Sequence, residues 1–233
     1  MSDPSNTSLI EFNSWTLRIR KAERSPVRPL LLIHGLTGDE NSMWVFARDL
    51  PKHYWMIAPR APHNAEPFGY SWRTVHPGTF GRPSFEQLLP AAEALIRLID
   101  EYQASAGIDA SPERSRSHPE RRRRIDVMGF SQGAAMSSVL AFLYPERIRK
   151  VGILAGFVPS GVEEYIPNRP LNGKKIFVAH GTKDEMVPVD RARASMEILE
   201  RAGAEITYCE DEVGHKVSLN CVRALRSYME MED

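Results

Sequence analysis

The stretch Gly129-Phe130-Ser131-Gln132-Gly133 decides how this chain folds, because of the segments on either side of it. It follows the apolar run 125–128, which is typical of a buried strand, and precedes residues 134–143, which are typical of a helix. Such a sharp turn forces its central residue into a strained backbone conformation, and the two glycines leave room for the neighbouring strand and helix. The pattern predicts that the hydroxyl of Ser131 stands exposed at the end of a strand.

Two other candidate residues, Asp184 and His215, also follow predicted strands. Asp184 comes after the apolar run 175–180, and His215 comes after the run 205–209. Loops that leave the carboxyl ends of parallel strands gather at one edge of the sheet. We therefore expect both side chains to lie close to Ser131.

These three residue types together can make a nucleophile. A serine hydroxyl is unreactive until a base removes its proton, and an imidazole, which titrates near neutral pH, suits His215 to that task. A carboxylate on the other ring nitrogen fixes the tautomer of the histidine and stabilises its protonated form. We predict Asp184 for that carboxylate, with Glu185 and Asp211 as the alternatives.

A glycine-bearing turn lies upstream, at residues 35–40, directly after the apolar run 30–34. A turn in this position can supply one backbone N–H group to a developing oxyanion, and the residue after the nucleophile supplies another. Here the two donors would be the N–H groups of Leu36 and Gln132. His34 is expected to order this turn by hydrogen bonding, rather than to act as a base.

Five motifs, in this order along the chain, resemble those of the phospholipase/carboxylesterase family of α/β-hydrolases, which includes acyl-protein thioesterases and small bacterial carboxylesterases. They are His34-Gly35-Leu36-Thr37-Gly38-Asp39-Glu40, Ala58-Pro59-Arg60-Ala61-Pro62, Gly129-Phe130-Ser131-Gln132-Gly133-Ala134, His180-Gly181-Thr182-Lys183-Asp184 and Gly214-His215. The resemblance runs from about residue 30 to the C-terminus. It implies a serine hydrolase with Ser131, Asp184 and His215 as its catalytic triad and Leu36 and Gln132 as oxyanion donors.

Strand-like and helix-like segments alternate along the rest of the chain, after one or two antiparallel edge strands expected before residue 27. The further strand candidates are 55–58 and 151–155, and the further helix candidates lie near 42–50, from 84 onward, over 189–199 and over 219–229. Such alternation predicts an α/β fold with a mostly parallel central sheet and helices on both faces. A length of 233 residues is suited to a single domain, 1–233.

Two segments depart from the family. The first is the loop 62–83, whose residues 69–73 only loosely match the aromatic loop of the family. This loop follows the carboxyl end of a predicted strand, so it lies on the same side of the sheet as the candidate site. Its Phe68, Tyr70 and Trp72 are our candidates for the wall of a substrate pocket, with burial beneath an ordered loop as the alternative.

The second departure is the charged stretch at about 104–124, which includes four consecutive arginines at 121–124. We expect it to be a solvated insertion. An anion-binding or nucleic-acid-binding tract is the alternative, but no aromatic residues are interleaved with the arginines.

The composition limits partners and location. Thirty basic and 30 acidic residues cancel, so no net field attracts nucleic acid or an anionic membrane. No apolar run approaches the roughly 20 residues that span a bilayer. We expect no nucleic-acid partner and no stable membrane association. The polar N-terminal residues 1–7 do not resemble a signal peptide, so cytoplasmic residence is the default.

The cysteines and histidines indicate neither a disulfide framework nor a metal centre. Cys209 and Cys221 flank the loop of His215, so a disulfide across it is one reading, but free buried thiols are expected in a cytosolic chain. The seven histidines show no metal-ligand spacing. We predict no metal and no cofactor.

These observations predict a soluble serine carboxylesterase that cleaves esters of short to medium acyl chains, with a small-molecule ester as substrate. A thioesterase or lysophospholipase acting on longer acyl groups is the alternative within the enzyme class. A binding module with a vestigial triad is the alternative from another class. The sequence leaves the alcohol, the choice between ester and thioester, and the oligomeric state open, with a homodimer among the options.

Overall fold

The computed structural model describes residues 6–75, 82–108 and 124–231. The core of the charged insertion, 109–123, lies outside the described residues, and so does the part of the aromatic loop at 76–81. Our expectation that the insertion is solvated therefore falls on residues that the structure does not describe.

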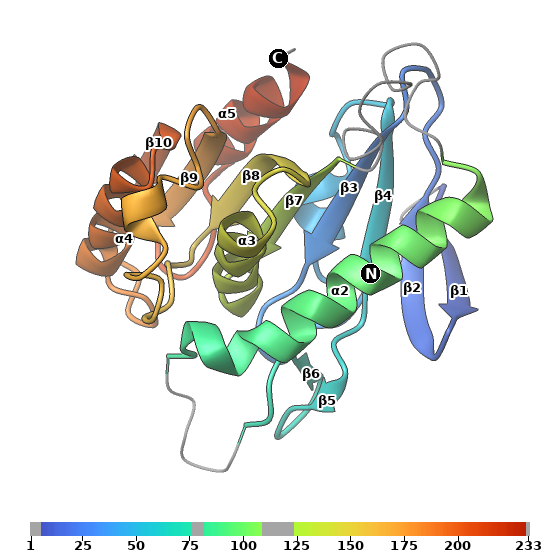
Figure 1. The fold of residues 1–233 in the computed structure, drawn as a ribbon, viewed down its shortest axis with the longest axis horizontal. Helices are drawn as coiled ribbons and strands as arrows, with labels where there is room; N and C mark the ends of the chain where they lie inside the picture. Colours follow the sequence, from blue (N-terminus) through green and yellow to red (C-terminus); the bar gives the residue numbers. More distant parts are fainter. Residues whose placement is uncertain (1–5, 76–81, 109–123, 232–233) are drawn as a thin grey trace.

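An eight-stranded sheet forms the centre of the molecule (Figure 1). Its strands, in spatial order, are β1 (Ser8–Phe12), β2 (Trp15–Arg20), β4 (Tyr54–Pro59), β3 (Arg28–Ile33), β7 (Ile125–Phe130), β8 (Ile148–Leu154), β9 (Lys175–Gly181) and β10 (Glu205–Asp211). The β1–β2 and β2–β4 pairs are antiparallel, and every pair from β4 to β10 is parallel. The predicted mostly parallel sheet with an antiparallel edge is confirmed.

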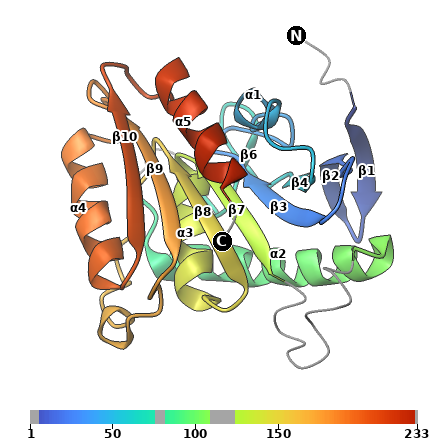
Figure 2. The ribbon, with the colours of Figure 1, turned by 90° about the horizontal axis from the view of Figure 1, so that it is seen from above.

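Helices cover both faces of the sheet (Figure 2). One apolar core lies between the sheet and α2 (Phe85–Ala106), α3 (Gln132–Leu143) and α4 (Val189–Arg201). A second core lies on the opposite face, beneath α1 (Trp44–Ala47) and α5 (Leu219–Glu230). A strand that is buried on both faces needs apolar residues at every position. In β3, accordingly, Leu31 and Ile33 belong to the first core, and Leu30 and Leu32 to the second.

The remaining short elements lie in the connections. The strands β5 (His63–Asn64) and β6 (Tyr70–Ser71) pair with each other inside the aromatic loop, and the 3-10 turn η2 (Ile166–Asn168) follows β8. The predicted helix start at Ser84 is also present, because its side chain accepts from the N–H of Gln87 while the Gln87 side chain accepts from the N–H of Ser84. No helix within 6–75, 82–108 and 124–231 combines the length and apolar character needed to cross a bilayer.

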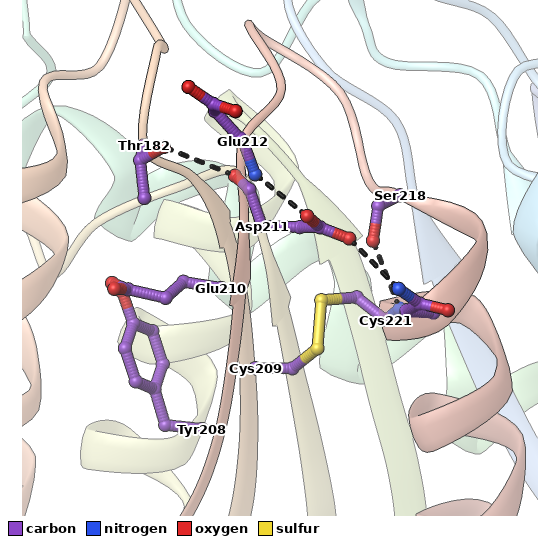
Figure 3. The surroundings of a disulfide bond; sticks show 9 residues. Thr182, Tyr208, Cys209, Glu210, Asp211, Glu212, Ser218 and Cys221 are labelled. Carbon is purple, nitrogen blue, oxygen red and sulfur yellow. Dashed lines mark hydrogen bonds between the residues drawn. A yellow bond between two sulfur atoms is a disulfide. The ribbon is translucent and has the colours of Figure 1, made fainter.

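The structure corrects one expectation, because Cys209 and Cys221 form a disulfide rather than two free thiols (Figure 3). Successive side chains of a strand point to opposite faces of the sheet. Cys209 of β10 therefore points toward the face that α5 covers, and Cys221 lies in the first turn of α5. Their Cα atoms are 5.6 Å apart, a separation that a disulfide spans.

Candidate active site

The backbone of Ser131 has the strained conformation that the sequence predicted. β7 ends at Phe130 and α3 begins at Gln132, so Ser131 alone makes the turn between them, with φ 54° and ψ −114°. Its N–H donates to the carbonyl of Leu154 at 2.9 Å, which holds the turn against β8. A non-glycine residue adopts such a conformation only where its surroundings enforce it, and this occurs mainly at functional sites.

The two glycines of the turn are required by close backbone contacts. A Cβ atom on Gly129 would lie 2.0 Å from the carbonyl oxygen of Gly133, and one on Gly133 would lie 2.0 Å from that of Ile33. Helix α3 thus packs directly onto the ends of β7 and β3, which directs its N-terminus at the sheet edge.

The structure brings Ser131, His215 and Asp184 into one hydrogen-bonded chain. Nδ1 of His215 lies 2.7 Å from Oδ2 of Asp184, and Nε2 lies 3.0 Å from Oγ of Ser131. A carboxylate only accepts hydrogen bonds, so Nδ1 carries the proton, and Nε2 is free to accept the proton of the serine hydroxyl. This is the geometry in which an imidazole can act as a base toward a serine.

Asp184, rather than either alternative, holds the histidine. It is buried, and its second oxygen accepts from the N–H groups of Met186 at 2.9 Å and Val187 at 2.8 Å. Asp211 instead accepts from the N–H of Glu212 at 2.8 Å and from Asn220 at 3.2 Å. Glu185 is exposed.

A second buried histidine, His180, lies behind the carboxylate and was not predicted as a site residue. Its Nε2 lies 2.7 Å from the carbonyl of Val187, so that nitrogen carries the proton, and the same atom is 3.5 Å from Oδ2 of Asp184. His180 therefore ties together the two ends of the loop that presents Asp184. The available signal was a histidine at the end of a strand, four residues before the acid.

The turn after β3 lies against the nucleophile. A Cβ atom on Gly35 would be 3.3 Å from the Cβ of Ser131. Within the described part of the chain, the N–H groups of Leu36 and Gln132 donate no hydrogen bond to the protein. Both predicted oxyanion donors thus have a free N–H group, one beside Ser131 in this turn and one at the first residue of α3.

His34 orders this turn, as expected. Its Nε2 accepts the N–H of Ala61 at 3.0 Å, so Nδ1 carries the proton and donates to the carbonyl of Gly35 at 2.7 Å. Burial lowers the pKa of His34 below its ordinary value. The ring is therefore a neutral structural element that joins the loop after β3 to the loop after β4.

The aromatic loop is fastened to the same edge of the sheet. The N–H of Tyr70 donates to the carbonyl of Gly38 at 2.9 Å, and the N–H of Thr37 donates to the carbonyl of Tyr70 at 3.0 Å. The side-chain oxygen of Gln132 accepts the N–H of Trp72 at 2.9 Å. This hydrogen bond to the side chain of Gln132 was not predicted, because no local pattern indicates a bond between residues 60 positions apart.

Trp72 does not line a pocket, which corrects our expectation. Its side chain is 1 % exposed, and its indole N–H donates to the carbonyl of His34 at 2.8 Å. Tyr70 is half-buried with the guanidinium of Arg60 over its ring, and Phe68 is 68 % exposed. Of the three candidate substrate residues, Phe68 is the one whose side chain is freely accessible.

Two aromatic side chains that the sequence did not single out pack beside the catalytic histidine candidate. The ring of Phe130 lies 5.0 Å from that of His215, measured between centroids, and the ring of Phe46 stacks on Phe130 at 5.5 Å. They provide an apolar support on one side of the imidazole. Within the described ranges, no group of three or more His, Cys, Asp and Glu side chains could hold a metal ion.

A mostly parallel sheet that carries a strained serine, a histidine and a buried aspartate in this chain order defines an α/β-hydrolase of the serine hydrolase class. The sequence profile of the Phospholipase/Carboxylesterase family matches residues 16–232, and the chain belongs to that family. It is thus a carboxylesterase-type enzyme that acts on esters.

Known proteins are similar to the chain along most of its length. A probable carboxylesterase SOBER1-like from Arabidopsis thaliana is 25 % identical over 215 residues, which cover 86 % of this chain and 77 % of that protein. Acyl-protein thioesterase 1 from Debaryomyces hansenii is 27 % identical over 209 residues, with coverages of 80 % and 82 %. The crystal structure of a carboxylesterase from Mesorhizobium loti superposes with a TM-score of 0.77 at 22 % identity, covering 98 % of this chain and all of that one, and supports the same fold.

Proposed function

We propose that this enzyme hydrolyses carboxylic esters of short to medium acyl chains through an acyl-enzyme on Ser131. The observation that carries the proposal is the continuous chain from the Asp184 carboxylate through both nitrogens of His215 to the Ser131 hydroxyl. No cofactor takes part in this reaction.

In the first half-reaction, Oγ of Ser131 attacks the ester carbonyl while Nε2 of His215 takes the hydroxyl proton. The N–H groups of Leu36 and Gln132 stabilise the negative charge that forms on the carbonyl oxygen. His215 then gives its proton to the leaving alcohol. Asp184 stays ionised throughout, because its role is to hold the ring and to stabilise its protonated form.

In the second half-reaction, water takes the place of the alcohol. His215 removes a proton from the water, which attacks the acyl group, and the same oxyanion donors serve again. Return of the proton to Oγ releases the carboxylic acid and restores Ser131. The same five residues thus perform both steps with the direction of proton transfer reversed.

The preference for shorter chains is supported by the aromatic loop, because only one of its three candidate wall residues is freely accessible. Trp72 is buried in the interior, so Phe68 is the large apolar side chain that the described part of this loop exposes. Each buried methylene contributes only about 0.8 kcal/mol, so a long chain gains affinity only where it finds a continuous apolar wall.

Relatives named acyl-protein thioesterase 1 give a second candidate function, hydrolysis of a long-chain acyl thioester. A series of p-nitrophenyl esters from acetyl to palmitoyl, with a palmitoyl thioester and its oxygen ester as a matched pair, distinguishes the two. We expect kcat/KM to peak at short or medium chains. A maximum at palmitoyl, or a strong preference for the thioester, would replace our proposal with the thioesterase.

We also propose that the enzyme acts in the cytoplasm on a small-molecule ester and without nucleic acid. The balance of 30 basic and 30 acidic residues supports the latter. Cell fractionation tests the location, and light scattering tests the homodimer that the sequence leaves open.

A further inference from the structure

The disulfide between Cys209 and Cys221 brackets the loop that carries His215. Cys209 lies on β10 and Cys221 in the first turn of α5 (Figure 3). His215 is midway between them in the sequence. The chain contains only these two cysteines. The disulfide therefore joins β10 and α5, the two elements that the loop of His215 connects.

The first half of this loop is held by the sheet without help from the disulfide. The N–H of Thr182 donates to the carbonyl of Asp211 at 2.9 Å, and the N–H of Lys183 donates to that of Val213 at 3.0 Å. The side-chain amide of Asn220 in α5 also donates to the carboxylate of Asp211 at 3.2 Å. This half should keep its place whatever the state of the cysteines.

The second half, from Gly214 to Ser218, depends on α5 for its position. In the described part of the chain, its backbone bonds are local: the N–H of Lys216 donates to Gly214 at 2.8 Å, and Ser218 accepts the N–H of Cys221 at its side-chain oxygen at 3.1 Å. The start of α5 is thus the far anchor of His215, and the disulfide, together with the hydrogen bond from Asn220 to Asp211, fixes that anchor to β10.

We propose that the Cys209–Cys221 pair is a redox modification site, at which a dithiol reductant lowers the activity of the enzyme by releasing the far anchor of His215. A disulfide in a reducing compartment is usually transient and redox-sensing, which fits the cytoplasmic location proposed above. This inference rests on the proposed role of His215.

The chemistry is thiol–disulfide exchange with a dithiol as the reductant. A thiolate of the reductant attacks the Sγ of Cys209, which is partly exposed, and Cys221, which is 1 % exposed, leaves as a thiolate and takes up a proton. The second thiol of the reductant then displaces Cys209. Two electrons and two protons pass to the protein, and the reductant leaves as its own disulfide.

Reduction should leave the fold in place. The turn at Ser131 should also keep its conformation, because the contacts that hold this turn are made by β7, β8 and α3, away from the disulfide. It should instead reduce the fraction of time in which His215 lies between Asp184 and Ser131. Since activity scales with the population of the competent state, we expect kcat to fall about tenfold with a smaller change in KM.

The experiment compares the oxidised enzyme with the same enzyme after dithiothreitol. Alkylation and mass measurement quantify the reduced pair, ester hydrolysis gives kcat and KM, and amide hydrogen exchange reports on residues 212–218. We expect faster exchange confined to this loop and the start of α5, together with the fall in kcat, and recovery of both on reoxidation.

The variant C209A/C221A is the matched control. It should show the lowered kcat of the reduced enzyme and should not respond to dithiothreitol, because it has no other thiol. Full reduction that leaves kcat or loop exchange unchanged would overturn the proposal. A reduced enzyme that has lost its circular dichroism signal at the assay temperature would also overturn it, because the bond would then support the whole fold. Labelling of Ser131 by a fluorophosphonate in the oxidised enzyme tests the proposed function separately.

Discussion

The imidazole of His215 lies 2.7 Å from the carboxylate of Asp184, although the two residues belong to loops that follow different strands, β10 and β9. These strands are parallel neighbours, with Asp211 paired to Gly181 at the ends of their ladder. A Cβ atom on Gly181 would lie 2.2 Å from the carbonyl of Val213, so the two loops are packed backbone to backbone. The contact between His215 and Asp184 is therefore set by the register of the sheet.

Replacement of Asp184 by asparagine should lower kcat on the order of 10⁴-fold, because an amide favours the wrong tautomer of His215. Asp211→Asn is the matched control, since it removes a half-buried carboxylate at the end of β10 that does not contact His215, and it should stay close to wild type. Steady-state kinetics on a p-nitrophenyl ester gives both values. A severe loss in Asp211→Asn, with Asp184→Asn nearly normal, would show that the acid is wrongly assigned.

Gly133→Ala should destabilise the fold by more than about 4 kcal/mol, because its Cβ would overlap the carbonyl of Ile33 at 2.0 Å. Gly173→Ala is the control for backbone conformation alone. Gly173 has φ +68° with no atom within 4 Å of an added Cβ, so Gly173→Ala should lower the free energy of unfolding by about 1 kcal/mol. Urea unfolding measures both. Equal losses would mean that α3 can move away from β3.

Trp72→Ala should act on stability, by about 3–5 kcal/mol, because a fully buried indole is removed and the carbonyl of His34 loses its partner. Phe68→Ala should change stability by less than about 0.5 kcal/mol, because the ring is exposed, but should raise KM more than it lowers kcat. Unfolding curves and Michaelis–Menten parameters are compared for the two variants. A stable Trp72→Ala enzyme with a raised KM would restore Trp72 as a pocket residue.

The stability of the enzyme should fall as the pH drops below about 6.5, in part through His34. Burial lowers the pKa of His34 in the folded state below its ordinary value of 6.5. Below that value the unfolded chain binds a proton that the folded chain does not, so the free energy of unfolding decreases until the folded pKa is reached. His34→Asn should be less stable at pH 7. Below pH 6.5, its free energy of unfolding should change less steeply with pH than that of the wild type. Burial also lowers the pKa of His53, so part of the slope should remain. An unchanged slope would contradict the assignment to His34.

Much of the site could be predicted because its requirements are local. Gly129 is required by a backbone contact within the turn and Gly133 by a contact with the end of β3, and a strand followed by a helix was visible in the neighbouring residues. Asp184 and His215 each follow an apolar strand, and parallel strands deliver their loops to one edge. The order of these elements in the sequence was therefore sufficient to predict that Ser131, Asp184 and His215 meet.

The features that were missed depend on contacts between distant segments. Trp72 looked like a pocket aromatic, but it is buried, with its backbone bonded to Gln132 and its indole to His34, and no local pattern reveals these contacts. The disulfide required knowing that Cys209 faces α5 and that the first turn of α5 lies beside β10. His180 appeared in a motif, but its role follows from the fold of the loop that returns to Val187.

Labelling with a fluorophosphonate is the most direct measurement of the central claim, that Ser131 is a nucleophile activated by His215 and Asp184. The native enzyme should gain the mass of one phosphonyl group, peptide mapping should place it on Ser131, and ester hydrolysis should stop in proportion to the label. Ser131→Ala should remain folded, take up no label and retain no more than about 10⁻⁴ of the wild-type kcat. A label on another residue, or a Ser131→Ala enzyme that keeps more than about a tenth of the activity, would contradict the account.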